Sequence, residues 1–188
     1  MREAKIKIRI KNDLLIAIKK ENPYWRAFYA TGYGRNMEEY LLMHPVEVLH
    51  LMNLGRAIVF TNDEKEIGPS ELLRKFQEKN KKQLWKYYLI YRDIRSRGYN
   101  VRVRDSNILP FEIFERGKTP LQHDSFALIA IAESSKPFRL EDLAQAIEEA
   151  KKLEKKLLIA LIDELGDVTY YSVDEALIEE TFLKIYRK

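Results

Sequence analysis

Residues 155–173 read KKLLIALIDELGDVTYYSV, and they predict a buried strand, a tight acidic turn and a returning strand. The uninterrupted apolar run of residues 157–162 is typical of a strand that is covered on both faces. Gly166 and Asp167 then allow the chain to reverse direction. We therefore expect a mixed sheet that ends in a hairpin around this turn.

The elements before this hairpin are expected to be both strands and helices. Residues 4–11 place Ile6, Ile8 and Ile10 on one face of a strand, and residues 14–19 read as its returning strand. The other expected elements are helices over residues 45–55, from residue 69, over 84–97 and over 140–150, and strands over 56–60, 99–104, 109–115 and 124–132.

The most polar stretch of the chain, residues 79–83, is the expected domain boundary. We predict an α/β (α+β) protein with a small mixed N-terminal domain, residues 1–80. A C-terminal domain, residues 81–188, should contain a mixed sheet flanked by helices.

Composition restricts the class of protein and of site. With 46% hydrophobic and 33% charged residues, the chain of 188 residues is typical of a globular protein, and its richness in Lys, Arg and Glu favours a thermophilic source. No apolar run is long enough for a membrane span or a signal peptide, so we expect a cytoplasmic protein. Without cysteine, and with three scattered histidines, His44, His50 and His123, we expect neither a metal site nor another cofactor.

Positive charge is concentrated in one stretch. Residues 74–104 contain 11 basic and 2 acidic residues, which gives +9, whereas the whole chain carries only +4. Such asymmetry favours an anionic partner, above all nucleic acid. The alternative interpretation, a pair of solvated lysine-rich helices, remains equally open on charge alone.

Three blocks of sequence together carry a resemblance to a known family. They are LWKYYLIYRDIRSRGY at residues 84–99, FEIFERG at residues 111–117 and KKLLIALIDELGD at residues 155–167. In this order they resemble the C-terminal domain of the archaeal tRNA-splicing endonucleases (tRNA-intron lyases), over about half of the chain. The resemblance implies metal-independent cleavage of precursor tRNA at bulge-helix-bulge intron junctions, with 2′,3′-cyclic phosphate and 5′-hydroxyl ends.

Cleavage of RNA without a metal requires a base, an acid and a cation that stabilises the phosphate. The resemblance implies that a Tyr, a His and a Lys fill these roles, and their positions in this chain are Phe114, Asp124 and Lys155. A phenyl ring transfers no proton, and a carboxylate repels a phosphodiester. In an alternative alignment, a loop shorter by one residue brings His123 to the position of the acid.

The resemblance also indicates residues that contact RNA or another subunit. The arginine with which the family grips a flipped base corresponds to Glu148, and its neighbouring partner position is Lys151. The turn of residues 163–167 matches an acidic loop that one dimer inserts into a basic pocket of the other, although an ordinary Asp-Gly hairpin would read the same. The predicted RNA-binding residues are Arg92, Arg95, Arg97 and Lys151, and the predicted interface residues are Asp163, Glu164 and Asp167.

These departures predict a structural, non-catalytic subunit of a heteromeric endonuclease. Its expected partners are a catalytic subunit, with which it forms a heterotetramer, and precursor tRNA. Residues 179–186 could extend a sheet edge toward that subunit. Two other hypotheses stay open: a self-sufficient nuclease that uses His123 and Lys155, and a stand-alone RNA-binding protein of the same fold.

Overall fold

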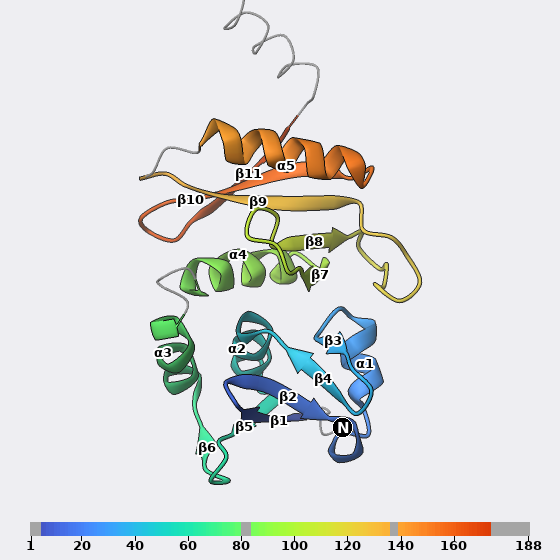
Figure 1. Ribbon diagram of the computed structural model, residues 1–188, viewed down its shortest axis with the longest axis vertical. Helices are drawn as coiled ribbons and strands as arrows, with labels where there is room; N and C mark the ends of the chain where they lie inside the picture. Colours follow the sequence, from blue (N-terminus) through green and yellow to red (C-terminus); the bar gives the residue numbers. More distant parts are fainter. Residues whose placement is uncertain (1–4, 80–83, 136–138, 174–188) are drawn as a thin grey trace, which may run out of the picture.

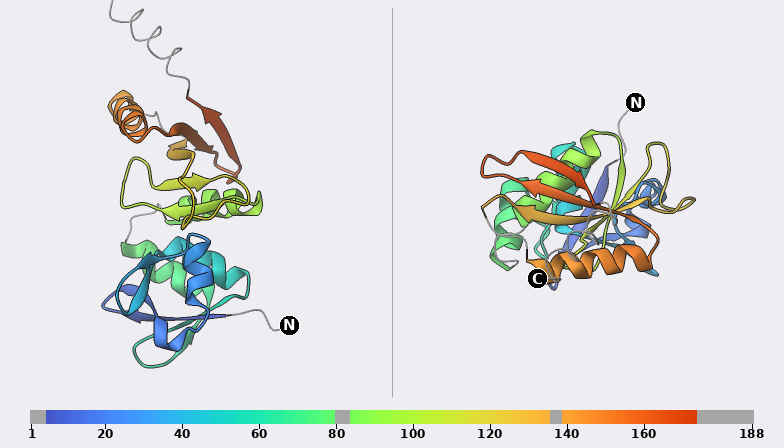
Figure 2. Two further views of the ribbon diagram at one scale, coloured as in Figure 1. Left: turned by 90° about the vertical axis from the view of Figure 1, so that its right-hand side faces the viewer. Right: turned by 90° about the horizontal axis from the view of Figure 1, so that it is seen from above.

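The computed structural model describes residues 5–79, 84–135 and 139–173. Two mixed sheets lie one above the other along the long axis of the molecule, with helix α4 (Leu84–Ser96) between them (Figures 1 and 2). The predicted α+β class is confirmed. Of the predicted domain boundary, residues 79–83, all but Lys79 lie outside the described residues, and so does the predicted pairing segment, residues 179–186.

The N-terminal half contains a six-stranded sheet in the order β3-β4-β2-β1-β5-β6. The predicted alternation of its first strand is confirmed, because Ile6, Ile8 and Ile10 are buried. The residues between the first hairpin and α2 also form elements that the sequence patterns did not predict, namely α1, β3 and β4. The elements are β1 (Ile6–Lys11), β2 (Leu14–Ile18), the 3-10 helix η1 (Lys19–Glu21), α1 (Trp25–Ala30), β3 (Arg35–Asn36), β4 (Tyr40–Met43), α2 (Pro45–Asn53), β5 (Ala57–Phe60), β6 (Glu66–Ile67) and α3 (Pro69–Lys79).

The C-terminal half contains a five-stranded sheet in the order β11-β10-β9-β8-β7, in which only β9 and β10 run parallel. The expected final hairpin is present as β10 and β11. The predicted strand over residues 124–132 begins three residues later, at Ala127, so Asp124 lies in the preceding loop. After α4 the elements are β7 (Asn100–Val103), β8 (Phe111–Phe114), β9 (Ala127–Glu133), α5 (Leu140–Lys152), β10 (Lys156–Ile162) and β11 (Val168–Ser172).

Strand β10 is less completely covered than its sequence predicts. Leu157, Ala160 and Ile162 are buried, whereas the residues between them are only half-buried. Helices α4 and α5 both contact the strand, but only β11 separates it from the edge of the sheet. The apolar run of residues 157–162 therefore predicted the strand correctly, but the prediction that both of its faces are covered was too high an estimate of its burial.

One hydrophobic core connects the two halves. It includes Ile8 and Val59 of the first sheet, Leu51 of α2, Tyr91 of α4 and Phe111 of the second sheet. A smaller core lies between α5 and the opposite face of the second sheet. Within the three described ranges, none of the helices is both long and apolar enough to cross a membrane.

Candidate functional site

The second sheet brings the three positions implied by the resemblance to one end. Strand β8 ends at Phe114, β9 begins three residues after Asp124, and β10 begins directly after Lys155. Hydrogen bonds join the strands at this end: the Phe126 N–H donates to the Ile113 carbonyl (2.9 Å) and the Lys156 N–H donates to the Phe126 carbonyl (3.0 Å). Three separate elements thus meet in the backbone, at the right-hand end of the sheet in Figure 1.

Phe114 is buried at this end, with 2% of its surface exposed. The guanidinium of Arg102 lies over its ring, 5.4 Å from the centroid. Arg102 is itself held by Glu112, at 3.1 Å, and donates to the Pro120 carbonyl at 3.2 Å. The position of the family's tyrosine therefore holds a covered hydrocarbon ring.

The loop between β8 and β9 carries both candidates for the acid. Asp124 is exposed, whereas His123 is half-buried. Nδ1 of His123 lies 3.3 Å from the Thr119 N–H, which can donate to it, and 3.4 Å from the Thr119 carbonyl oxygen. The same carbonyl accepts the backbone N–H groups of Gln122 and His123 (3.0 Å each). Among the described residues, Nε2 of His123 has no hydrogen-bond partner. The imidazole is therefore fixed through one nitrogen, and the carboxylate faces solvent.

Lys155 follows the C-terminal end of α5. Its backbone N–H donates to the Ala150 carbonyl (2.9 Å), and its side chain is half-buried. No described carboxylate lies within ion-pair distance of its ammonium group, so this cation is available to an anion. In the part of the chain that the structure describes, no group of three His, Asp or Glu side chains could hold a metal ion.

Comparison with known proteins identifies the fold that carries this site. A model of the tRNA intron endonuclease catalytic C-terminal domain matches residues 84–170. The tRNA-splicing endonuclease of Methanothermobacter thermautotrophicus is 30% identical over 162 residues, which cover 86% of this chain and 93% of that protein. The chain belongs to the tRNA-splicing endonuclease family.

Other members of the family differ in length. The tRNA-splicing endonuclease of Methanococcus vannielii is 30% identical over 75% of this chain and 78% of its own length. That of Methanococcoides burtonii is 26% identical over 87% of this chain, which corresponds to only 44% of that protein. This chain thus matches most of the shorter members and less than half of a longer one.

The predicted RNA-binding residues occupy different surroundings. Arg92 is exposed over the ring of Tyr88, and Arg97 is exposed but bound to Asp93 (2.8 Å). Arg95 is half-buried: its guanidinium makes five hydrogen bonds within the chain, and the residue also borders a second groove, next to Arg92. Lys151 is exposed in the last turn of α5, and Glu148 is exposed one turn before it.

The acidic turn, residues 163–167, has the hydrogen bonds of an Asp-Gly hairpin, and its tip projects from the surface. Oδ1 of Asp163 accepts the N–H groups of Leu165 and Asp167 (2.9 Å each), which accounts for one carboxylate through turn chemistry. Glu164 and Asp167 are exposed, and Leu165 at the tip is 90% exposed. The turn therefore presents an apolar tip between carboxylates.

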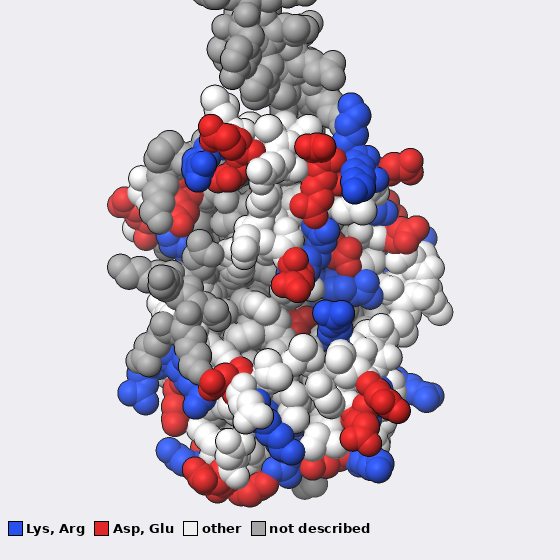
Figure 3. All heavy atoms as spheres, in the orientation of Figure 1, with Lys and Arg blue, Asp and Glu red and all other residues white. Residues whose placement is uncertain are grey.

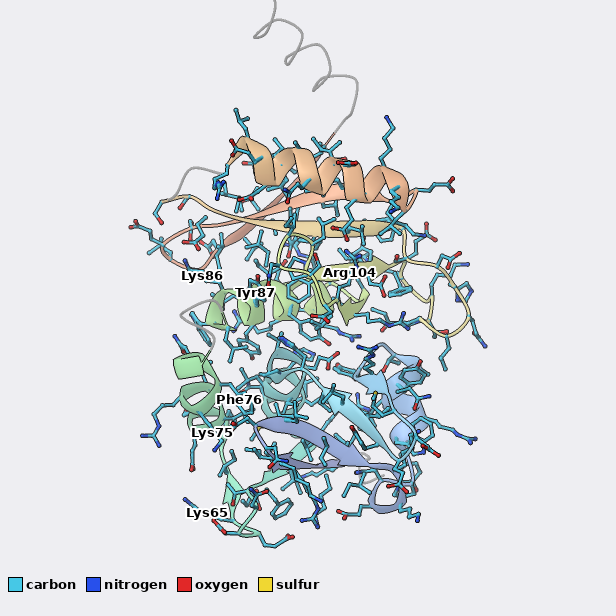
Figure 4. All side chains as sticks on the ribbon, in the orientation of Figure 1. Lys65, Lys75, Phe76, Lys86, Tyr87 and Arg104 are labelled. Carbon is cyan, nitrogen blue, oxygen red and sulfur yellow. The ribbon has the colours of Figure 1, made fainter. Side chains whose placement is uncertain are left out.

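A groove of about 990 Å³ runs between the two halves. Phe76 of α3, Tyr87 of α4 and Arg104 beyond β7 surround it (Figure 4). Its cations are matched by acids, since Arg104 is bound to Glu149 at 2.7 Å, and Figure 3 shows basic and acidic atoms mixed around this waist. Mixed charge makes the groove a poor site for a polyanion.

Burial shifts the pKa values of three groups near α2 that the sequence analysis left without a role. It raises the pKa of Glu47 to about 7 and lowers those of His44 and His50 to about 4. Glu47 accepts the N–H groups of Gly34 (3.1 Å) and His44 (2.8 Å). His44 and Glu47 form a capping box at the start of α2. Their spacing of three residues, with Pro45 between them, is the sequence signal that could have identified this pair.

Proposed function

We propose that this chain is the structural, non-catalytic subunit of a heteromeric tRNA-splicing endonuclease. The assembly would cleave precursor tRNA at bulge-helix-bulge intron junctions and leave 2′,3′-cyclic phosphate and 5′-hydroxyl ends. The observation that supports this proposal most is the state of Phe114, which lacks a hydroxyl and lies buried under Arg102.

The missing hydroxyl matters because the 2′-hydroxyl of the substrate must lose a proton. Loss of a positioned acid or base lowers a rate by about 10²- to 10⁴-fold. Phe114 supplies no such group, and its burial leaves no room for a substrate atom against the ring. At the position aligned with the acid, Asp124 would repel the phosphate that Lys155 attracts.

The catalytic groups would then come from a partner subunit. The acidic turn supports such an assembly, since Glu164 and Asp167 carry charge that steers association and Leu165 supplies an apolar contact. A heterotetramer of two structural and two catalytic subunits would bury this turn. Exposed cations, Arg92, Lys151 and Lys155, would add contacts to the tRNA backbone.

A cleavage assay on precursor tRNA tests the proposal. We expect no cleavage by the purified chain and full cleavage after co-expression with the catalytic subunit. A Glu164→Gln, Asp167→Asn variant should weaken assembly, whereas Glu154→Gln, a matched change on another exposed turn, should not. Cleavage by the chain alone at the rate of the assembly would overturn the proposal.

One observation favours a second candidate, a self-sufficient nuclease that uses His123 and Lys155. No described side chain binds Nε2 of His123, so this nitrogen could face a leaving group, as a general acid requires, and the Thr119 carbonyl at 3.4 Å could accept the Nδ1–H of an imidazolium. This candidate requires metal-independent cleavage that His123→Ala abolishes. A stand-alone RNA-binding protein would instead give strongly salt-dependent binding without any co-purifying subunit.

A further inference from the structure

Arg95 connects the N-terminal half to the second sheet. Its Nη1 donates to the Thr31 carbonyl (2.8 Å), which follows α1, and to Oδ1 of Asn100 (3.0 Å), the first residue of β7. Its Nη2 donates to the Val101 carbonyl (2.7 Å) and to the Tyr91 hydroxyl (2.9 Å). Because each of these acceptors belongs to a packed element, the guanidinium has one position.

The backbone of the N-terminal half also touches β7 and the loop that follows β8. Gly32 has φ +91°, and a Cβ at this residue would lie 2.7 Å from the Val101 carbonyl oxygen and 3.2 Å from Cγ of Pro120. Contact this close requires glycine. The segment around Thr31 and Gly32 is thus seated against the elements that lead to the candidate site.

Asn100 links Arg95 to the loop between β8 and β9 by two hydrogen bonds. Its Oδ1 accepts from Arg95, and its Nδ2 donates to the Lys118 carbonyl (2.7 Å). That carbonyl and the N–H of Thr119 belong to the same planar peptide group, so an orientation imposed on one is imposed on the other. The Thr119 N–H in turn donates to Nδ1 of His123 (3.3 Å). The Thr119 carbonyl oxygen lies 3.4 Å from the same nitrogen, but it already accepts two backbone N–H groups, which favours the N–H as the partner of Nδ1.

We propose that the N-terminal half orients His123 through this chain of hydrogen bonds, with Arg95 and Asn100 as positioning residues. A neutral imidazole that accepts at Nδ1 carries its proton on Nε2. The ring then presents Nε2–H as a donor at the end of the sheet where Lys155 lies. The proposal concerns the orientation of the ring, and it holds whether this chain cleaves RNA or only binds it.

The bonds of Asn100 can be separated by one substitution. Asn100→Asp keeps an oxygen that accepts from Arg95 and removes the donor to Lys118. Asn53→Asp is the matched control, because it also removes one Nδ2 donor. That donor binds the Tyr88 hydroxyl (2.7 Å) and has no bond to the loop that carries His123.

Nitrogen-15 NMR of the His123 ring in the full chain measures the tautomer, with His123→Gln as the assignment standard. We expect the Nε2–H tautomer in the wild type and in Asn53→Asp, and a mixture of tautomers in Asn100→Asp. Amide hydrogen exchange at Thr119 should accelerate about threefold to tenfold in Asn100→Asp alone, the ratio that corresponds to one lost hydrogen bond.

Two results would overturn the proposal. One is an Asn100→Asp variant whose tautomer and Thr119 exchange match those of the wild type. The other is a predominant Nδ1–H tautomer in the wild type, which requires no variant and so remains decisive if Asn100→Asp does not fold.

Discussion

Replacing Arg95 with methionine separates a structural role from contact with RNA. The Arg95→Met variant keeps an unbranched stem and removes five hydrogen bonds, which reach Tyr91, Thr31, Asn100 and Val101. Each of the two carbonyl acceptors left without a donor costs about 1–3 kcal/mol, so the free energy of unfolding should fall by about 2–6 kcal/mol. That is a large fraction of the stability of a typical domain.

Arg92→Met is the control on the same helix. Arg92 is exposed, and its guanidinium lies over the ring of Tyr88, 5.7 Å from the centroid, so its loss should cost about 0.5–1 kcal/mol. Urea unfolding can be followed by tryptophan fluorescence, because Trp25 reports on the N-terminal half and Trp85 on α4. Equal stability of the two variants, together with loss of RNA binding in Arg95→Met, would refute the reasoning and return Arg95 to the RNA-binding surface.

Three further predictions concern stability and chemistry. Because desolvation lowers the pKa of the half-buried His44 to about 4, its side chain binds a proton between pH 4 and 6.5 in the unfolded state and not in the folded state. The contribution of His44 to stability is therefore complete above pH 6.5 and falls toward pH 4, whereas the raised pKa of Glu47 acts in the opposite direction. His44→Asn keeps a cap for the Val46 N–H and should reduce this pH slope, measured by urea unfolding, by about 1.4 kcal/mol per pH unit; an unchanged slope would contradict it. Gly32→Ala should lower the free energy of unfolding by about 1–3 kcal/mol, because the new Cβ meets the Val101 carbonyl at positive φ, and a neutral effect on thermal unfolding would be evidence against this contact. Phe114→Tyr should destabilise the chain by about 1–3 kcal/mol through a buried hydroxyl without a partner, and should not by itself enable the isolated chain to cleave precursor tRNA.

Local patterns predicted the parts of the fold that depend on period and turn chemistry. The alternation of Ile6, Ile8 and Ile10 identified β1, and the apolar run before the Asp-Gly turn identified β10 and β11. Strand β4 escaped prediction because it depends on pairing with a distant strand, β2, as Met43 does with Leu15, whereas β3 and β6 are only two residues long. Two-residue strands carry no period of their own.

The candidate site was predictable in position and only partly in detail. The resemblance to the family indicated that Phe114, Asp124 and Lys155 belong to one site, and the sheet brings all three positions to one end. That Arg102 covers Phe114, and that Thr119 anchors His123, depends on loop geometry that no spacing encodes. The choice between Asp124 and His123 depends on the same loop and stays open to experiment.

The basic stretch of residues 74–104 shows that charge clustered along the sequence need not form a basic surface in the folded chain. Several cations of the +9 stretch are used within the chain: Lys86 pairs with Glu133, Arg97 with Asp93, Arg102 with Glu112, Arg104 with Glu149, and Arg95 lies among backbone carbonyls. A cation that is already paired releases few counterions on binding RNA and adds little affinity. The basic stretch thus does more to join α4 and β7 to their neighbours than to attract a polyanion. This pairing of cations within the chain supports the proposed role, in which the chain would share the precursor tRNA with a catalytic subunit.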